Sequence, residues 1–275
     1  GGSFVVIHSG GVDIKGAKSI LTAEAVRESD PADAPGDPES RSREWFDVCG
    51  ALPKEDSDGN GTRTDAIVDG AVEEGLLDFL NEVNPTLLSD AEPIQLDLVA
   101  LAPYLVEVVP EVEAWLSVKA SPWGIYLTTY STMNVLRQHL RRYLQVLIPD
   151  ETKPVLLRFY DPRNIWDFLS VLSEWEKYLF VGPVDKITTL WNGEEKCKTF
   201  HEIKDKFPVD SGTRRKIMKV SRAQMDALIL IFVERYIESL AEKLKIRGEP
   251  PEKINKEIIG NTLQWLRHQG ITDDR

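Results

Sequence analysis

The stretch PVLLRFYDPRNIWDFL, residues 154–169, decides how the middle of this chain is interpreted. Its first half is rich in residues that favour strands, and its second half has the apolar spacing of a helix. Asp161 followed by Pro162 is typical of a helix start, because the aspartate accepts free amide hydrogens of the first turn and proline removes a donor that has no partner there. The stretch therefore predicts a strand over 153–160 and then a helix that Asp161 caps.

The charged residues of this stretch raise the question of a catalytic or anion-binding site. Arg158 and Tyr160 would share one face of the predicted strand, since side chains alternate. A partly buried guanidinium needs a carboxylate or carbonyl partner, and Asp69, Asp161 or Glu107 could supply one. We interpret Asp161 as a cap rather than a general base.

Strand and helix patterns continue on both sides of this stretch and predict one α/β unit between residues 66 and 208. We expect a strand followed by an amphipathic helix over 66–83, a helix at 112–118, a core strand at 123–130, helices at 132–148 and 161–180, and a further strand up to 191. Beyond Pro208 the sequence predicts two helices, the first of which is long and begins after Ser221 as its N-cap.

The N-terminal region has a different character. Residues 4–8 and 12–15 are expected to be short strands around a Gly10–Gly11 turn. Linker-like sequence follows at 28–44 and 55–65, and between these linkers lies a short apolar island at 44–52. This island is either a docking segment with aromatic anchors or a short surface helix packed on its own domain.

Together these patterns predict an α+β fold in three parts. Residues 1–58 would hold short β-strands, a linker and the apolar island. Residues 59–208 would form a mixed α/β lobe, and residues 209–275 a smaller all-helical lobe.

Composition narrows the function. The chain has 275 residues and a net charge of −12, which argues against a general nucleic-acid binder. No apolar run is long enough to span a membrane. Two cysteines allow one disulfide at most, and we expect free thiols in a reducing cytoplasm. The four histidines are scattered, and the sequence holds no phosphate-binding, dinucleotide-binding or nucleophile-elbow motif, so no metal, cofactor or catalysis is expected.

Six motifs follow one another along the predicted α/β unit. They are DAIVDGA (65–71), PYLVEV (103–108), WGIYL (123–127), HLRRYLQV (139–146), LLRFYDPR (156–163) and FVGPV (180–184). In this order they resemble the effector-loading adaptor chaperones of the bacterial type VI secretion system, over residues 65 to about 200. The most specific part is RFYDPR following HLRR. The resemblance marks these signature residues, which we expect to be mainly structural: Asp69, Trp123, His139, Arg141, Arg142, Arg158, Tyr160, Asp161, Arg163 and Pro183.

The first seventeen residues resemble something else. GGSFVVIHSGGVDIKGA is similar to the last β-repeats of a VgrG spike protein, the trimeric tip of the same secretion machine. Because the sequence also starts without a methionine, we expect residues 1–58 to be a spike tail joined to the adaptor by natural or engineered fusion. An ordinary N-terminal extension is the alternative.

The resemblance implies a binding function without chemistry, in the bacterial cytoplasm. Such an adaptor binds an effector toxin and the C-terminal tail of the VgrG spike, and neither nucleic acid nor membrane. We expect the apolar island to dock in a groove of the α/β lobe through four anchors: Trp45, Phe46, Val48 and Leu52. We expect the helical lobe to face the effector with Arg214, Arg215, Phe232, Arg235 and Tyr236.

Two other functions remain open from the sequence. One is a metal-dependent hydrolase effector that uses some of the many carboxylates. The other is a phosphate- or carbohydrate-binding module that uses the arginines around His139. An interaction with an acidic protein would suit residues 201–247, which carry eleven Lys and Arg against seven Asp and Glu.

Overall fold

A computed structural model describes residues 4–8, 11–15, 61–83, 87–89, 102–207, 217–248, 250 and 254–268. In chain order the elements are β1 (Phe4–His8), β2 (Gly11–Lys15), β3 (Arg63–Asp69), α2 (Leu76–Val83), β4 (Leu87–Ser89), β5 (Pro103–Glu107), α4 (Pro110–Ser117), β6 (Gly124–Thr129), α5 (Met133–Leu140), the 3₁₀ turn η2 (Arg141–Tyr143), β7 (Gln145–Leu147), β8 (Val155–Leu156), α6 (Ile165–Val171), α7 (Glu174–Val181), β9 (Val184–Trp191), β10 (Glu194–Thr199), α8 (His201–Asp205), β11 (Met218–Lys219), α9 (Arg222–Ile246) and α10 (Lys256–His268).

The centre of the fold is a six-stranded sheet with the strand order β10-β9-β6-β3-β5-β4. Every pairing in it is antiparallel. The fold is therefore α+β, as the sequence predicts. A second sheet has the order β11-β7-β8, and β1 pairs with β2 in an antiparallel hairpin.

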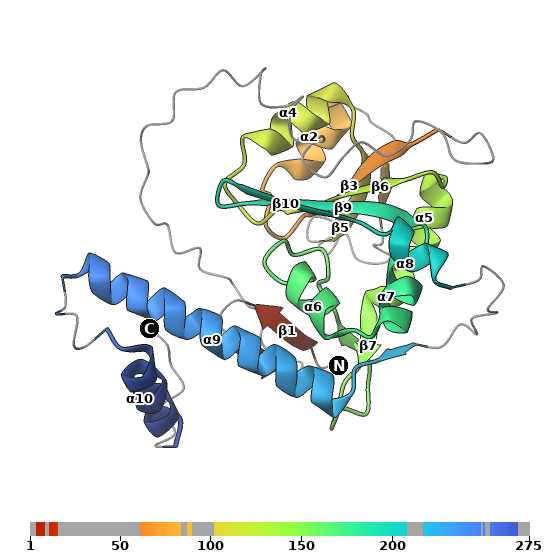
Figure 1. The fold of residues 1–275 in the computed structure, drawn as a ribbon. Coiled ribbons are helices and arrows are strands. Elements are labelled where there is room, and N and C mark those ends of the chain that lie inside the picture. Colours follow the sequence, from red (N-terminus) through yellow and green to blue (C-terminus); the bar gives the residue numbers. More distant parts are fainter. Residues whose placement is uncertain are drawn as a thin grey trace.

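Side-chain alternation along the central strands divides the interior into two clusters on opposite faces of the sheet. Ile67, Ile125 and Leu127 belong to the larger cluster, which α5, α6, α7 and the first half of α9 cover. Their neighbours Val68 and Tyr126 belong to the smaller cluster, which α2 and α4 cover. Figure 1 shows these two helices on one side of the sheet and α6 and α7 on the other. The sheet is thus the middle layer of three.

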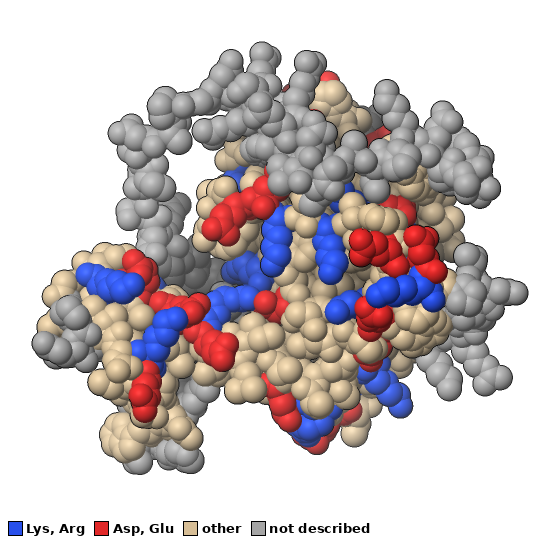
Figure 2. Space-filling model, in the orientation of Figure 1, with Lys and Arg blue, Asp and Glu red and all other residues tan. Residues whose placement is uncertain are grey.

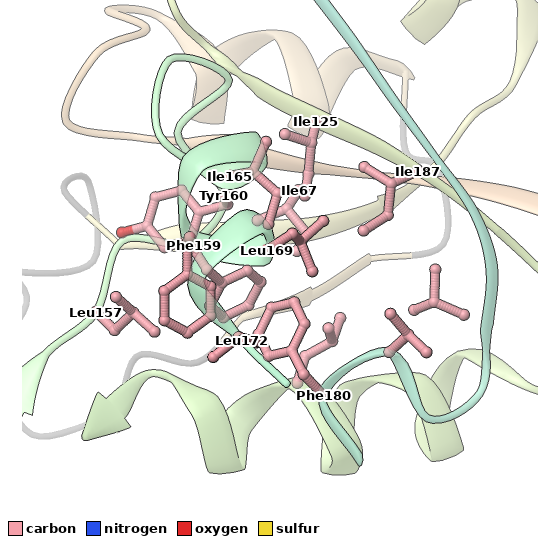
Figure 3. Close-up of a cluster of buried hydrophobic side chains, with 14 of the residues drawn as sticks. Ile67, Ile125, Leu157, Phe159, Tyr160, Ile165, Leu169, Leu172, Phe180 and Ile187 are labelled. Atoms are coloured by element: carbon pink, nitrogen blue, oxygen red, sulfur yellow. The ribbon is translucent and has the colours of Figure 1, made fainter. Parts of the chain in front are cut away.

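The larger cluster is built around aromatic rings. Phe180 of α7 packs edge-to-face against Phe159 and Phe168, with ring centroids 5.5 and 5.3 Å apart. Figure 3 shows Phe159 and Phe180 turned toward each other beneath Ile165 and Leu169 of α6. This cluster fixes the loop that follows β8 against the sheet.

The long helix α9 belongs to two environments. It begins with a capping box, in which Ser221 accepts from the Gln224 amide and the Gln224 side chain accepts from the Ser221 amide. In its first half, Met225, Leu228 and Phe232 belong to the larger cluster. Its second half extends beyond the α/β body, where α10 packs against it (Figure 1).

Several predicted elements are confirmed. The helix with Leu76 and Leu80 on its buried side, the fully buried strand β6 and the long helix with Ser221 as its N-cap lie where the sequence places them. The predicted N-terminal strands correspond to β1 and β2.

The strand predicted over 153–160 is wrong beyond Leu156, where β8 ends. Phe159 and Tyr160 are consecutive and both lie in the larger cluster, which a strand could not achieve because it would turn one of them to the opposite face. The chain turns there instead, with the Asp161 amide donating to the Arg158 carbonyl at 3.2 Å.

Two predicted helices are also shorter than expected. The helix predicted over 132–148 ends at Leu140, because 145–147 form β7 between β8 and β11. The helix predicted over 161–180 is two helices, since Leu172 has an extended backbone and Ser173 starts α7 with its own capping box. Asp161 does not cap α6, which begins at Ile165. The Asp161 carboxylate instead accepts a hydrogen bond from the Arg163 amide, in the turn that precedes α6.

Candidate functional site

Part of the signature meets around the turn that follows β8, namely Asp69, Arg158, Tyr160, Asp161 and Arg163. Asp69 ends β3, and its amide donates to the Trp123 carbonyl at 2.7 Å. Its buried carboxylate accepts from the Ala71 amide at 3.0 Å and from the Arg158 guanidinium. Of the three candidate partners for Arg158, Asp69 is the one that the structure pairs with it. Burial raises the pKa of Asp69 above its ordinary value, and Arg158 partly offsets that rise.

Two aromatic signature residues, Tyr160 and Trp123, lie on opposite faces of the sheet, and Tyr160 is the one beside this ion pair. The Arg158 guanidinium lies 5.9 Å from the centre of the Tyr160 ring, and burial raises the pKa of that tyrosine. Trp123 is almost completely buried and meets Tyr126 edge-to-face at 4.9 Å. The ion pair therefore lies beside the Tyr160 ring and joins the central sheet to the loop after β8.

A second ion pair lies in the same turn and reaches α9. Arg163 Nε donates to Asp161 Oδ1 at 2.9 Å, and Arg163 Nη2 donates to Asp161 Oδ2 at 2.7 Å. The carbonyl of Arg163 accepts from Arg235 Nη1 at 2.8 Å, and the other arm of the Arg235 guanidinium binds the Asp167 carboxylate. The RFYDPR motif thus connects β3, α6 and α9 through charged groups.

The two motifs HLRRYLQV and FVGPV meet at the end of α7. His139 Nε2 donates to the Phe180 carbonyl at 2.7 Å, and the Tyr143 hydroxyl donates to the Leu179 carbonyl at 2.6 Å. Both bonds satisfy carbonyls that a helix end leaves without a partner. Burial lowers the pKa of His139 to about 4, so the imidazole is neutral at ordinary pH.

Gly182 is required where these motifs touch. Its φ is +48°, and a Cβ at this position would lie 2.1 Å from His139 Cε1. The next carbonyl, that of Pro183, accepts from the Thr129 hydroxyl at 2.6 Å and ties the loop to β6. Arg141 and Arg142 lie on the surface of η2.

Most signature residues thus make contacts within the protein. Asp69, Arg158, Asp161 and Arg163 form two ion pairs, while His139 and Pro183 hold the end of α7 and the start of β9. These contacts join elements to one another. Within the described residues no group of three or more His, Cys, Asp and Glu could hold a metal ion.

Residues 66–178 match the family model described as "Domain of unknown function (DUF4123)". The match begins within β3 and ends within α7, so it contains every signature residue except Pro183. Neither a curated protein nor a solved structure matches the chain.

Beyond the DUF4123 match, apolar side chains face solvent on α9 and α10. We call this surface the helical arm and define it by five residues: Ile229, Leu230, Ile246, Ile258 and Trp265. Leu230 is 63% exposed, Ile246 79% and Trp265 59%. The sequence holds a signal for part of this surface. Residues 228–233 read LILIFV, and a helix that is apolar all round has more apolar faces than one core can cover.

The predicted effector-facing residues are distributed differently from the prediction. Phe232 belongs to the larger cluster, so its ring does not lie on the surface that we expected to face the effector. Arg235 is bound to α6, and Tyr236 is half-buried beside it. Arg214 and Arg215 lie outside the described residues, as do the four docking anchors Trp45, Phe46, Val48 and Leu52.

The prediction of free thiols is wrong for Cys197, which is bonded in a disulfide. Cys197 lies half-buried on β10, at the edge of the central sheet. In the described part of the chain, no helix combines the length and the hydropathy that crossing a membrane requires.

Proposed function

We propose that this chain is a non-enzymatic adaptor chaperone of bacterial type VI secretion. In this proposal it binds an effector toxin in the cytoplasm and the C-terminal tail of a VgrG spike, so that the toxin is loaded on the spike for delivery. The order and spacing of the six motifs support the assignment, and the DUF4123 match covers most of the same residues.

The observation that carries a binding function is the helical arm. Contiguous exposed apolar patches mark surfaces at which other proteins bind, and in this proposal the exposed apolar residues of α9 and α10 form such a patch. Ile246 and Trp265 belong to two different helices, α9 and α10, which pack against each other. Trp265 is an aromatic side chain of the type that carries much of the binding energy at interfaces.

The charge pattern is consistent with a protein partner. Figure 2 shows Lys and Arg side chains interspersed with Asp and Glu on this face of the molecule, rather than gathered in one basic stripe. Charged side chains of α9 and α10 also pair with each other, as Lys256 does with Glu238 at 2.6 Å. Polypeptide partners with mixed charges suit such a surface better than a phosphate backbone does.

The test is a binding titration of the full chain with a type VI effector held in an inactive form. Changing both Ile246 and Trp265 to Ser is expected to weaken binding by at least about tenfold, because each buried apolar side chain contributes roughly 1.5–3 kcal/mol. The matched control is Val118→Ser. Val118 is also an exposed apolar residue, 69% exposed, but it ends α4 on the other side of the sheet.

Equal binding by the arm variant and the wild type would show that the helical arm is not the effector surface. Absence of binding to every effector and spike tail tried, together with turnover of a substrate, would replace the adaptor proposal with the hydrolase alternative.

A further inference from the structure

One part of the central sheet is buried without an apolar layer. On β9, Lys186 and Thr188 lie on the same face as Tyr126 of β6, because Thr188 pairs with Tyr126 and side chains alternate. On β10, the residues opposite Lys186 and Thr188 are Thr199 and Cys197. We call this surface the polar face and define it by Lys186, Thr188, Glu195, Cys197 and Thr199.

The apolar cluster on that side of the sheet does not extend over β9 and β10. The cluster under α2 and α4 takes its described members from β3, β5, β6 and the two helices, and none from β9 or β10. Lys186 and Thr188 are nevertheless only 4% exposed. Glu195 Oε1 is buried as well, and no described donor binds it. The apolar cluster under α2 and α4 therefore does not explain the burial of these polar side chains.

The disulfide identifies what covers the polar face. Cys197 points to this face and is bonded in a disulfide, and the chain has two cysteines. The second is Cys49, which lies in the middle of the apolar island EWFDVCGAL at 44–52. We infer that residues 44–52 dock across the polar face of β9 and β10, with Cys49 bonded to Cys197 and with Trp45 and Phe46 as anchors.

The length of the chain permits this placement. The described structure resumes at Gly61, immediately before β3, and Cys49 lies twelve positions earlier. From β3 to β10 is three steps across the sheet, through β6 and β9, or about 14 Å at the usual strand spacing. Twelve residues can span up to about 40 Å. The island can therefore reach β10 over the same face.

The docking inference rests on the proposed function only in treating the island as a spike tail. It can be tested with the full chain alone, without an effector or a spike protein, so its failure and that of the adaptor proposal are distinguishable.

The first experiment is a peptide map of the full chain after equilibration in buffer without reductant. Trypsin cleaves after Arg43 and Lys54 and so releases residues 44–54, which contain Cys49 and all four anchors. The expected product is this peptide joined to the peptide of Cys197, and the two separate on treatment with a thiol reductant. A free Cys197 thiol, or Cys197 joined to Cys197 of a second chain, would overturn the inference.

The second experiment tests docking rather than the bond. Acylation of Lys186 by an amine reagent is measured by mass spectrometry in the wild-type chain and in a variant with Trp45→Ala and Phe46→Ala. Loss of the anchors is expected to increase the rate at Lys186 several-fold. Lys198 is the internal control, since it is exposed on the opposite face of β10 and its rate should not change. An unchanged rate at Lys186 in a folded variant would overturn the docking of the island.

Discussion

The signature region and the helical arm place their side chains in opposite ways. Around the turn after β8, charged groups such as Asp69 and Asp161 lie inside the protein, each with an arginine as its partner. On the arm, large apolar groups such as Ile246 and Trp265 lie in water. The region whose residue types suggest chemistry is therefore internal, and the region whose residue types suggest a core is on the surface. Environment, rather than residue type, separates the structural residues from the proposed binding residues here.

The largest expected effect comes from breaking the Asp69–Arg158 pair. Arg158→Met leaves the buried Asp69 carboxylate without its cation, and such a loss destabilises proteins by about 3–5 kcal/mol. Urea unfolding of the purified chain would measure it. Adding Asp69→Asn should restore most of the stability, because the second change removes the unpaired charge.

The matched control for this prediction is an ion pair on the surface. Arg222 of α9 binds Asp150, and both side chains are largely exposed. Arg222→Met is expected to leave stability unchanged within error, since exposed pairs contribute little. If Arg158→Met were as stable as the wild type but no longer bound an effector, the signature region would be a binding site and the comparison above would fail.

A smaller effect is expected from His139, and it depends on pH. In the folded protein the pKa of His139 is lowered to about 4, against about 6.5 in an unfolded chain. The stability that the neutral imidazole contributes is complete above pH 6.5 and is lost as the pH falls toward 4, because the unfolded chain then binds a proton that the folded chain excludes. The full difference is about 3 kcal/mol.

Unfolding titrations of the wild type and of His139→Gln between pH 7 and 4 would isolate this contribution. Glutamine can donate to the Phe180 carbonyl but does not titrate in this range. The wild type should therefore lose more stability than the variant on acidification. Parallel pH curves for the two proteins would show that His139 is not excluded from protonation, and that the end of α7 is more open than the structure has it.

Much of the fold follows from the sequence by local rules. The long helix is found because Ser221 is a typical N-cap before a long apolar stretch, and β6 because WGIYLTTY is rich in strand formers. The pairing of Arg158 with Asp69 was within reach as well, because a partly buried guanidinium requires a carboxylate and few were available in the motifs.

Other features depend on contacts between distant residues. The strand after Lys153 stops at Leu156 because Phe159 and Tyr160 both pack into the larger cluster. Phe159 packs there against Phe180, which lies more than twenty positions away in the sequence. Phe232 was assigned to the surface because a helical pattern does not tell which of its apolar sides a core will cover. The prediction of free thiols is wrong at Cys197 because it rests on an expected reducing compartment, and the sequence does not tell which cysteines meet in space.

The smallest expected effect on stability concerns the helical arm. Ile246→Ser removes an apolar side chain that is 79% exposed in the free chain, so it should change the free energy of unfolding by less than about 0.5 kcal/mol. Thermal and urea unfolding of this variant and of Arg158→Met would measure both changes in the free energy of unfolding. The change should be smallest for Ile246→Ser and largest for Arg158→Met. A loss of stability comparable to that of a core substitution would mean that Ile246 is covered within the free protein. The arm would then be part of the fold, and effector binding would have to be sought on another surface.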